Sequence, residues 1–478
     1  MRQHYRREPE LGDTPIESLK IPTKSRDELP PVLRALQYIY CTPELKDAIF
    51  SLLEKKITMT DIGTPGMSLW EILIIGVVRL TLDANYDRLE HIVNYDELVR
   101  GMLGIQKFGG EKKEYGVQTL RDNVYLLDET ILKEINELLV EHGHAIKKKD
   151  NSEKGETESL AIKIDSYAVE SNVHFPTDYN LLWDSVRKSL ALTKQILEGH
   201  RDIQGWRKIG HWEKTMRNLF EQVRRSSHRG GVKKKTKLKS ATRKYIHAAE
   251  DLYAKLMMFR GSVNDPMVSW KEWDYYVSML AKHIDLTSRR ILREEVIPHE
   301  EKVFSIFEPY TEWISKGKAN RQVELGVKVA IATDQDGFIL RHVVMLKQQD
   351  VDITVSLAKE LLAKYSIDSI SFDKGFWSKD NFEELQQPDV HIVLPKKGKQ
   401  TKVEYEREHA PEFKKLRRRH SEVESNINAL EHHGVNRCPD RGLIGFRRYV
   451  ALGVLAYNLH KLGNLLLERD RNQKRAAA

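Results

Sequence analysis

The stretch LAIKIDSYAVES, residues 160–171, decides the fold class. Apolar and polar residues alternate along it from Leu160 to Glu170, a pattern typical of a half-buried β-strand. Before this stretch, from about Pro30 to Ile146, apolar residues recur at three- and four-residue steps, which predicts helices. The sequence therefore predicts an all-α region followed by an α/β region.

The segment KKKDNSEKGETES, residues 147–159, joins the two regions. It contains no aliphatic residue and concentrates charge, Gly and Ser, which indicates a solvated linker. We therefore predict a helical N-terminal domain over residues 1–146 and a second domain over residues 160–470. Within the first domain, Ser68 followed by Glu71 predicts a capping box at the start of a helix.

The second domain shows a mixed order of strands and helices. Strand patterns over Val323–Ala332 and Phe338–Leu346 flank the turn DQDG and predict a hairpin. They are followed by the helix DVDITVSLAKELLAKY, the strand SIDSISFD, the helix SKDNFEELQQ, the strand DVHIVLP and a long helix from Pro411 to His432. This order predicts a mixed sheet with helices on its faces.

Two further helical segments complete the second domain. Residues from about 179 to 307 are rich in Lys, Arg and Trp, and we interpret them as a helical, basic insertion. The last helix, from Gly445 to about Leu467, is apolar enough to belong to the core.

The composition excludes several classes of protein. Of the 478 residues, 40% are hydrophobic and 31% charged, which indicates a globular chain of two to three domains. Cys41 and Cys438 lack the spacing of a disulfide framework or a thiolate zinc site. The apolar stretch Leu69–Leu82 contains charges and is too short to cross a bilayer, so we expect a cytoplasmic protein without a membrane partner. The net charge of +8 suggests a polyanionic partner.

Three acidic residues occupy positions suited to a shared site. We expect Asp165 and Asp373 at the ends of inner strands and Glu424 on the long helix that packs on the sheet. Carboxylates placed in this way can converge on hard cations such as Mg²⁺. Each residue alone is more simply explained as a turn, a cap or a solvated side chain, and helical periodicity leaves Glu422 equivalent to Glu424. The combination carries the prediction.

Four stretches resemble bacterial insertion-sequence transposases. They are DSYAVESNVHFPTD (165–178), GKANRQVELGVKV (317–329), FDKGFWS (372–378) and the region from RRRHSEVESNINALEHHG through GFRRYVALGVLAYNL (417–459). The resemblance extends over nearly the whole chain and implies a ribonuclease H-like catalytic fold with a DDE triad. It also implies that the helical N-terminal domain serves DNA binding or dimerisation. It assigns Asp165 and Asp373 as the two aspartates and Glu424, in the word RHSEVE, as the glutamate, leaving Glu422 as a solvated residue able to pair with Arg418 or Arg419.

The resemblance also implies the chemistry and the partners. The triad residues would bind two Mg²⁺ ions, for which Mn²⁺ can substitute, and would catalyse cleavage at transposon ends and strand transfer into target DNA. The partners would be the terminal inverted repeats and target DNA, bound by a homo-oligomer on paired ends in the nucleoid. The sequence leaves two alternatives open, a catalytically inactive protein that binds DNA ends and a metal-dependent nuclease without strand transfer.

Several basic residues are candidates for DNA contacts. Many relatives carry Lys or Arg seven residues after the glutamate, where this chain has Glu431. Arg437 is our candidate to replace that contact, with Arg441 and Arg447 as further possibilities. A basic run in the insertion, either a solvated loop or a phosphate-binding segment, contains Lys233, Lys234, Lys235, Lys237 and Lys239. Nearby tryptophans would either fill the core of the insertion or stack on DNA; these are Trp206, Trp212 and Trp270.

Overall fold

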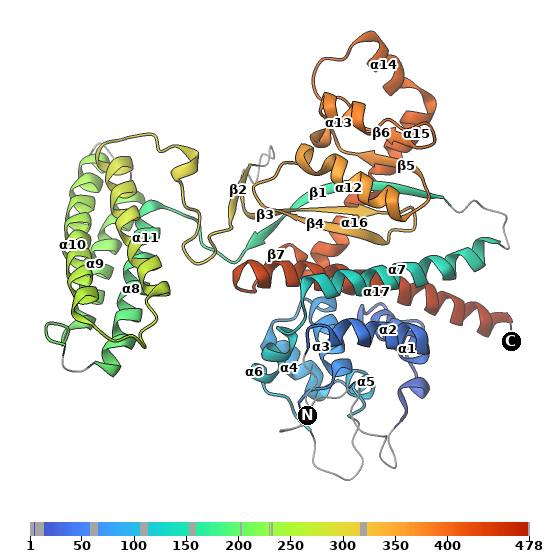
Figure 1. Ribbon diagram of the computed structural model, residues 1–478, viewed down its shortest axis with the longest axis horizontal. Helices are drawn as coiled ribbons and strands as arrows, with labels where there is room; N and C mark the ends of the chain where they lie inside the picture. The colour runs from blue at the N-terminus through green and yellow to red at the C-terminus, as the bar shows by residue number, and fades with distance from the viewer. Residues whose placement is uncertain are drawn as a thin grey trace. The chain divides into compact units, whose positions relative to one another are not determined.

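The computed structural model consists of two compact units. It describes residues 4, 14–57, 66–105, 113–152, 159–200, 203–228, 230, 233–315 and 323–476. Unit 1 comprises Met1–Asn172 and Ile314–Ala478, and unit 2 comprises Val173–Trp313 (Figure 1). The chain thus leaves unit 1 after the first strand, forms unit 2, and returns.

The N-terminal part of unit 1 is helical, as the sequence predicts. Ser68 and Glu71 form the predicted capping box, in which each side chain accepts the backbone N–H of the other residue. The helices are α1 (Leu29–Cys41), α2 (Pro43–Glu54), α3 (Leu69–Thr81), α4 (Tyr86–Tyr95), α5 (Glu97–Met102), α6 (Val117–Val124) and α7 (Glu129–Ser152), with a short 3-10 turn η1 (Ile16–Ser18).

A mixed sheet forms the other half of unit 1. Its strands are β1 (Leu160–Ser171), β2 (Glu312–Ser315), β3 (Val323–Thr333), β4 (Ile339–Met345), β5 (Ile367–Phe372), β6 (His391–Val393) and β7 (Arg437–Cys438). The order is β2-β3-β1-β5-β6, with β4 paired to β3 and β7 to β1. β1 is antiparallel to β3 and parallel to β5. The predicted mixed, ribonuclease H-like α/β sheet with its β3–β4 hairpin is therefore present.

The helices that follow β4 in the chain differ from the prediction in one place. They are α12 (Asp350–Lys364), α13 (Lys379–Glu384), α14 (Lys402–His409), α15 (Pro411–His420), α16 (Glu422–Leu430) and α17 (Gly442–Ala476), with short turns η4 (Lys374–Phe376) and η5 (Glu431–Val435). The single helix predicted from Pro411 to His432 is interrupted at Ser421. Its hydroxyl donates to the carbonyl of Arg418 at 2.8 Å, and such back-bonding competes with the regular helix ladder.

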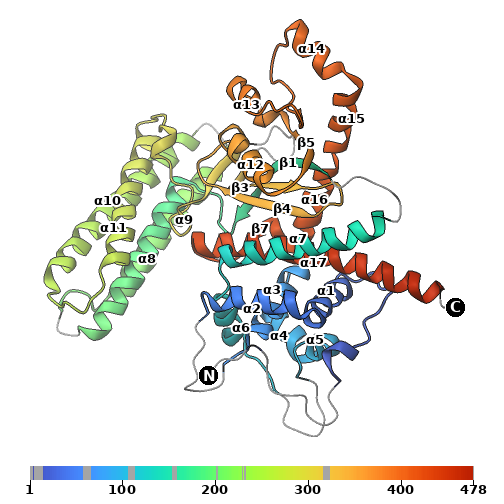
Figure 2. The ribbon, with the colours of Figure 1, turned by 45° about the vertical axis from the view of Figure 1, so that its right-hand side comes forward.

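Helix α17 is the central core element of unit 1. It packs on α1, α3, α7 and β4, and both views show it running with α7 between the N-terminal helices and the sheet (Figures 1 and 2). At Gly463 an added Cβ would lie 1.7 Å from the carbonyl oxygen of Pro31, so only glycine permits this approach to α1. Among the described helices α17 alone is long and apolar enough to cross a membrane, but 78% of that apolar window is buried in the protein.

The predicted linker over residues 147–159 is shorter in the structure. Lys147–Ser152 continue α7, because Lys is a good helix former and Lys147 pairs with Asp336 at 3.3 Å. Residues 153–158 lie outside the described residues. The N-terminal helices and the sheet also cluster as one compact unit, whereas the sequence suggests two domains. Helix α17 explains the difference, because it packs against both the N-terminal helices and strand β4 of the sheet.

Unit 2 contains the predicted helical insertion. Its long helices are α8 (Asp178–Gly199), α9 (Ile209–His228), α10 (Lys234–Ser262) and α11 (Lys271–Thr287), followed by the short turns η2 (Ser288–Leu292) and η3 (His299–Glu301). They enclose a core of their own. Trp206 is buried in this core, and Trp212 and Trp270 pack against it, so these tryptophans are core residues rather than an exposed stacking surface.

Candidate active site

Strand register brings Asp165 and Asp373 together. Ile164 of β1 pairs with Phe372 of β5 in the parallel ladder, so the next residue on each strand is one of the two aspartates. Neighbouring strands lie about 4.8 Å apart, and paired positions project to the same face. The expectation that Asp165 ends its strand is wrong, since β1 continues to Ser171. Only β5 ends there, which leaves space beside Asp165.

Glu424 comes from the helix on the same face. It is the third residue of α16, which packs on β1. The side chain of Lys163, two residues before Asp165 and therefore on the same face, reaches Glu422 of this helix. The three acidic residues predicted from the sequence thus come from two adjacent strands and one helix that covers them.

The electrostatics of Asp165 reflect this gathering. Burial and, to a smaller extent, the nearby carboxylates of Asp373, Asp350 and Glu424 raise the pKa of its carboxyl group from 3.8 to about 7. The N–H of Ser166 donates to Asp165 Oδ1 at 2.7 Å and opposes the shift. The site is therefore a place where negative charge is concentrated without full compensation from the protein.

Sequence reasoning missed a carboxylate on the other face of the sheet. Asp350 begins α12, and its Oδ1 accepts a hydrogen bond from the Ser166 hydroxyl at 2.6 Å. Lys328 of β3 donates to Oδ2 at 3.1 Å. Asp350 therefore fixes the residue that follows Asp165. An acidic residue at a helix start has an ordinary explanation as a helix-dipole partner, so its sequence position alone gave no signal.

His420 supports Asp373 from the end of α15. Its Nδ1 lies 3.1 Å from the hydroxyl of Ser371, two residues before Asp373 on β5. Burial lowers the pKa of this imidazole to about 4, although Asp373 opposes the shift, so His420 is neutral at pH 7. The histidine of the RHSEVE word therefore ties the end of α15, just before the helix with the glutamate, to the strand that precedes the second aspartate.

The donor set of the site fits a hard divalent cation. All three residues offer carboxylate oxygens, which Mg²⁺ and Mn²⁺ prefer, and the raised pKa of Asp165 shows that added positive charge would be favourable there. Within the described residues, no three His, Cys, Asp or Glu side chains are gathered closely enough to hold a metal ion. The three carboxylates lie on neighbouring elements of the fold: β1, α16 and the residue that follows β5.

The basic residues predicted to contact DNA lie outside the stretches that carry the three carboxylates. Most of them are exposed. Arg437 is exposed on β7 and donates to Asn172 at 2.9 Å. Arg441 is exposed, and Arg447 lies 3.8 Å from Glu129. The five lysines of the basic run lie at the start of α10 in unit 2.

The comparison with known families agrees with this geometry. Residues 284–459 match the family model of the transposase DDE domain. The matched segment contains Asp373 and Glu424, and Asp165 precedes it in the chain. No curated protein and no solved structure matches the chain. Together with the mixed sheet and the three acidic residues on neighbouring elements, this match is consistent with a DDE transposase of the insertion-sequence type.

Proposed function

We propose that the protein cleaves DNA at the ends of its own transposon and joins those ends to target DNA. Asp165, Asp373 and Glu424 form the catalytic centre and would hold two Mg²⁺ ions, for which Mn²⁺ can substitute. Divalent ions at such a site stabilise charge on the attacking and leaving oxygens of phosphoryl transfer. The paired ends would be held by more than one copy of the chain.

The proposed reaction has two balanced steps. In the first, the oxygen of water attacks the phosphorus at the transposon end, and the P–O3′ bond breaks to release a 3′-hydroxyl. In the second, this 3′-oxygen attacks a phosphodiester of the target, forming a new P–O bond as the target's own 3′-oxygen leaves. Neither step needs a covalent intermediate with a protein side chain. The carboxylates would hold the cations so that the reacting oxygens are oriented and negative charge on the phosphoryl group is stabilised.

A single observation carries this proposal. Asp165 and Asp373 follow a registered pair in two parallel strands, on the face that α16 covers with Glu424. Two aspartates at neighbouring positions of adjacent strands do not stabilise the fold, because their like charges repel each other. A function that uses clustered carboxylates explains why both occur here.

A strand-transfer assay separates the proposal from the two alternatives. The substrate is a labelled, pre-cleaved transposon end mixed with a supercoiled plasmid and Mg²⁺. We expect covalent joining of the label to the plasmid. A nuclease without strand transfer would nick DNA without joining it, and an inactive end-binding protein would shift the labelled end in a gel without either product.

Unit 2 offers the most concentrated positive charge for binding DNA. Residues 203–247 contain fourteen Lys or Arg and two Asp or Glu, whereas the whole chain has a net charge of only +8. Most of these basic side chains are exposed on α9 and at the start of α10. This segment therefore supports binding to the phosphate backbone, which depends on charge rather than on sequence.

Neutralising the five lysines of the basic run should weaken DNA binding and reduce its salt dependence. The variant replaces Lys233, Lys234, Lys235, Lys237 and Lys239 by glutamine. For each phosphate that the protein then fails to neutralise, the slope of log affinity against log salt should fall by about 0.9. Fluorescence anisotropy with a labelled duplex at several salt concentrations measures both quantities. An unchanged slope would show that the run is only a solvated segment.

Glu294 provides a variant expected to act in the opposite direction. Its carboxylate pairs with Lys235 at 2.7 Å and with Lys239 at 2.5 Å. Hydrogen bonds from these lysines lower the pKa of Glu294 to about 2, so it is ionised at pH 7. Glu294→Gln frees both lysines and should strengthen DNA binding a few-fold. Equal or weaker binding would contradict a role for the run in phosphate contact.

A further inference from the structure

A buried lysine connects the strand of the first aspartate to the helix of the glutamate. Lys163 on β1 is 3% exposed. Its Nζ donates to Oε2 of Glu422 at 2.6 Å and to the backbone oxygen of Asp334 at 3.0 Å. This finding corrects the expected partner of Glu422, which is neither Arg418 nor Arg419. An ammonium group that is buried requires such acceptors, so the contact is strongly favoured.

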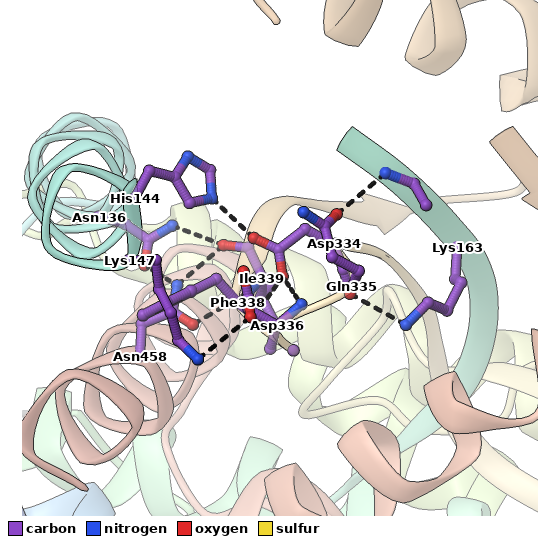
Figure 3. A network of polar contacts seen from close by, with 12 residues as sticks. Asn136, His144, Lys147, Lys163, Asp334, Gln335, Asp336, Phe338, Ile339 and Asn458 are labelled. Carbon is purple, nitrogen blue, oxygen red and sulfur yellow. Dashed lines mark hydrogen bonds and ion pairs between the residues drawn. The ribbon is translucent and has the colours of Figure 1, made fainter. Parts of the chain in front are cut away.

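The acceptor at Asp334 is itself held rigidly. Figure 3 shows Lys163 reaching from β1 to the hairpin turn between β3 and β4. Within that turn, Asp334 accepts the N–H groups of Asp336 and Phe338, both at 2.9 Å. Its second oxygen lies 2.7 Å from Nε2 of His144 on α7. The predicted hairpin turn DQDG is confirmed, and the contact of Asp334 with His144 adds a link to α7.

Both residues of this ion pair lie two positions before a proposed catalytic residue. Lys163 lies two residues before Asp165 on β1, and Glu422 lies two residues before Glu424 on α16. The ion pair therefore connects β1 and α16, the two elements that carry Asp165 and Glu424. At Ser421, between α15 and α16, the backbone hydrogen bonds span three residues, so the ion pair adds a second constraint on the rotation of α16.

The position of the Glu424 carboxylate depends on how α16 lies on the sheet. Its side chain is exposed, and within the described residues it has no hydrogen bond or ion pair. The rotation of α16 thus determines where the carboxylate points. A change of one residue in helical position rotates a side chain by about 100°, which would carry it away from Asp165.

We propose that Lys163 is a positioning residue, which sets α16 on the sheet through Glu422 so that Glu424 faces Asp165. The inference rests on the proposed function, because it assumes that Asp165, Asp373 and Glu424 bind divalent cations. A purely structural ion pair would stabilise the fold and leave the affinity for cations unchanged. The two roles therefore predict different results from direct binding measurements.

The test measures Mn²⁺ binding by isothermal titration calorimetry on the full chain without DNA. We expect Lys163→Met and Glu422→Ala each to raise the Mn²⁺ dissociation constant about tenfold, as for other groups that orient metal ligands. The double variant should be no worse than either single variant, because both remove the same contact. Lys163→Arg, which keeps the charge and the donors, should recover part of the affinity.

A matched control is the half-buried ion pair between Arg34 of α1 and Asp470 of α17, with an N–O distance of 2.8 Å. Arg34→Met should lower the thermal unfolding midpoint and leave Mn²⁺ binding unchanged. Wild-type affinity in both Lys163→Met and Glu422→Ala, or multiplied effects in the double variant, would overturn the inference. If Asp165→Asn binds Mn²⁺ as tightly as the wild type, the proposed function fails as well, which separates the two failures. Should Lys163→Met not fold, as judged by circular dichroism, Glu422→Ala decides alone.

Discussion

Asparagine at position 165 or 373 should reduce cleavage of a transposon end by roughly a thousandfold or more, while binding of that end changes little. Each change keeps the shape of the side chain and removes a negatively charged oxygen ligand. Glu424→Gln should have a comparable effect, because the third carboxylate completes the same site. The basic surface of unit 2, which we propose as a DNA contact, is unaltered in all three variants.

Cleavage is measured with a labelled duplex that carries the transposon end, in Mg²⁺ and in Mn²⁺, and binding with the same duplex in EDTA. Asp368→Asn is the matched control. Asp368 is exposed on β5, but strand alternation places it on the face opposite Asp373. It should cleave at the wild-type rate. Near-normal cleavage by Asp165→Asn or Asp373→Asn would contradict the catalytic assignment.

Asp165→Asn should also make the cation-free protein more stable at pH 8, by roughly 2–4 kcal/mol. Burial and the neighbouring carboxylates raise the pKa of Asp165 to about 7 in the folded state, compared with 3.8 for an ordinary aspartate. Folding therefore opposes ionisation of this group. An amide cannot ionise, so the variant does not experience that cost.

The sign of the pH dependence follows from the two pKa values. Below about pH 4 Asp165 is protonated in both states, and it contributes no difference in stability. As the pH rises from 4 to 7, the unfolded state ionises first and becomes relatively more favourable. The wild type thus loses stability in this window, and the advantage of Asp165→Asn grows until about pH 7 and then stays constant.

Urea unfolding in EDTA at pH 5, 6, 7 and 8 measures this difference. The advantage of Asp165→Asn over the wild type should increase from pH 5 to pH 8 and shrink when Mn²⁺ is added. Asp368→Asn, which changes an exposed side chain of β5, is the control. If the stability advantage of Asp165→Asn stays constant or decreases with pH, the pKa of Asp165 is not raised in the folded protein.

Local sequence patterns were sufficient to predict the elements that carry the site. Alternation predicted β1, the turn DQDG predicted the β3–β4 hairpin, and the strand before Asp373 followed from the apolar run SIDSISFD. These features depend on neighbours in the sequence, where spacing and residue type decide the structure. The choice of Glu424 over Glu422 needed the family resemblance, since periodicity treats them alike.

The supporting residues could not be predicted, because they depend on tertiary contacts. Lys163 occupies a polar position in an alternating strand, and nothing near it in sequence indicates Glu422, 259 residues away, as its partner. Asp350 looks like a helix start until the fold places Ser166 against it. The interruption at Ser421 was missed because its backbone angles stay helical, and only a change to three-residue backbone hydrogen bonds and a side-chain hydrogen bond mark it.

The position of α17 in unit 1 has a consequence for how the protein is made. Arg34 pairs with Asp470, 436 residues later, and α17 covers the apolar faces of helices synthesised first. Such non-local contacts delay folding, whereas unit 2 is a continuous segment with its own core and can fold as soon as it leaves the ribosome. Pulse proteolysis of stalled nascent chains should find unit 2 protected before unit 1. The strands and helices that carry the three carboxylates would then be assembled only after α17 has been translated.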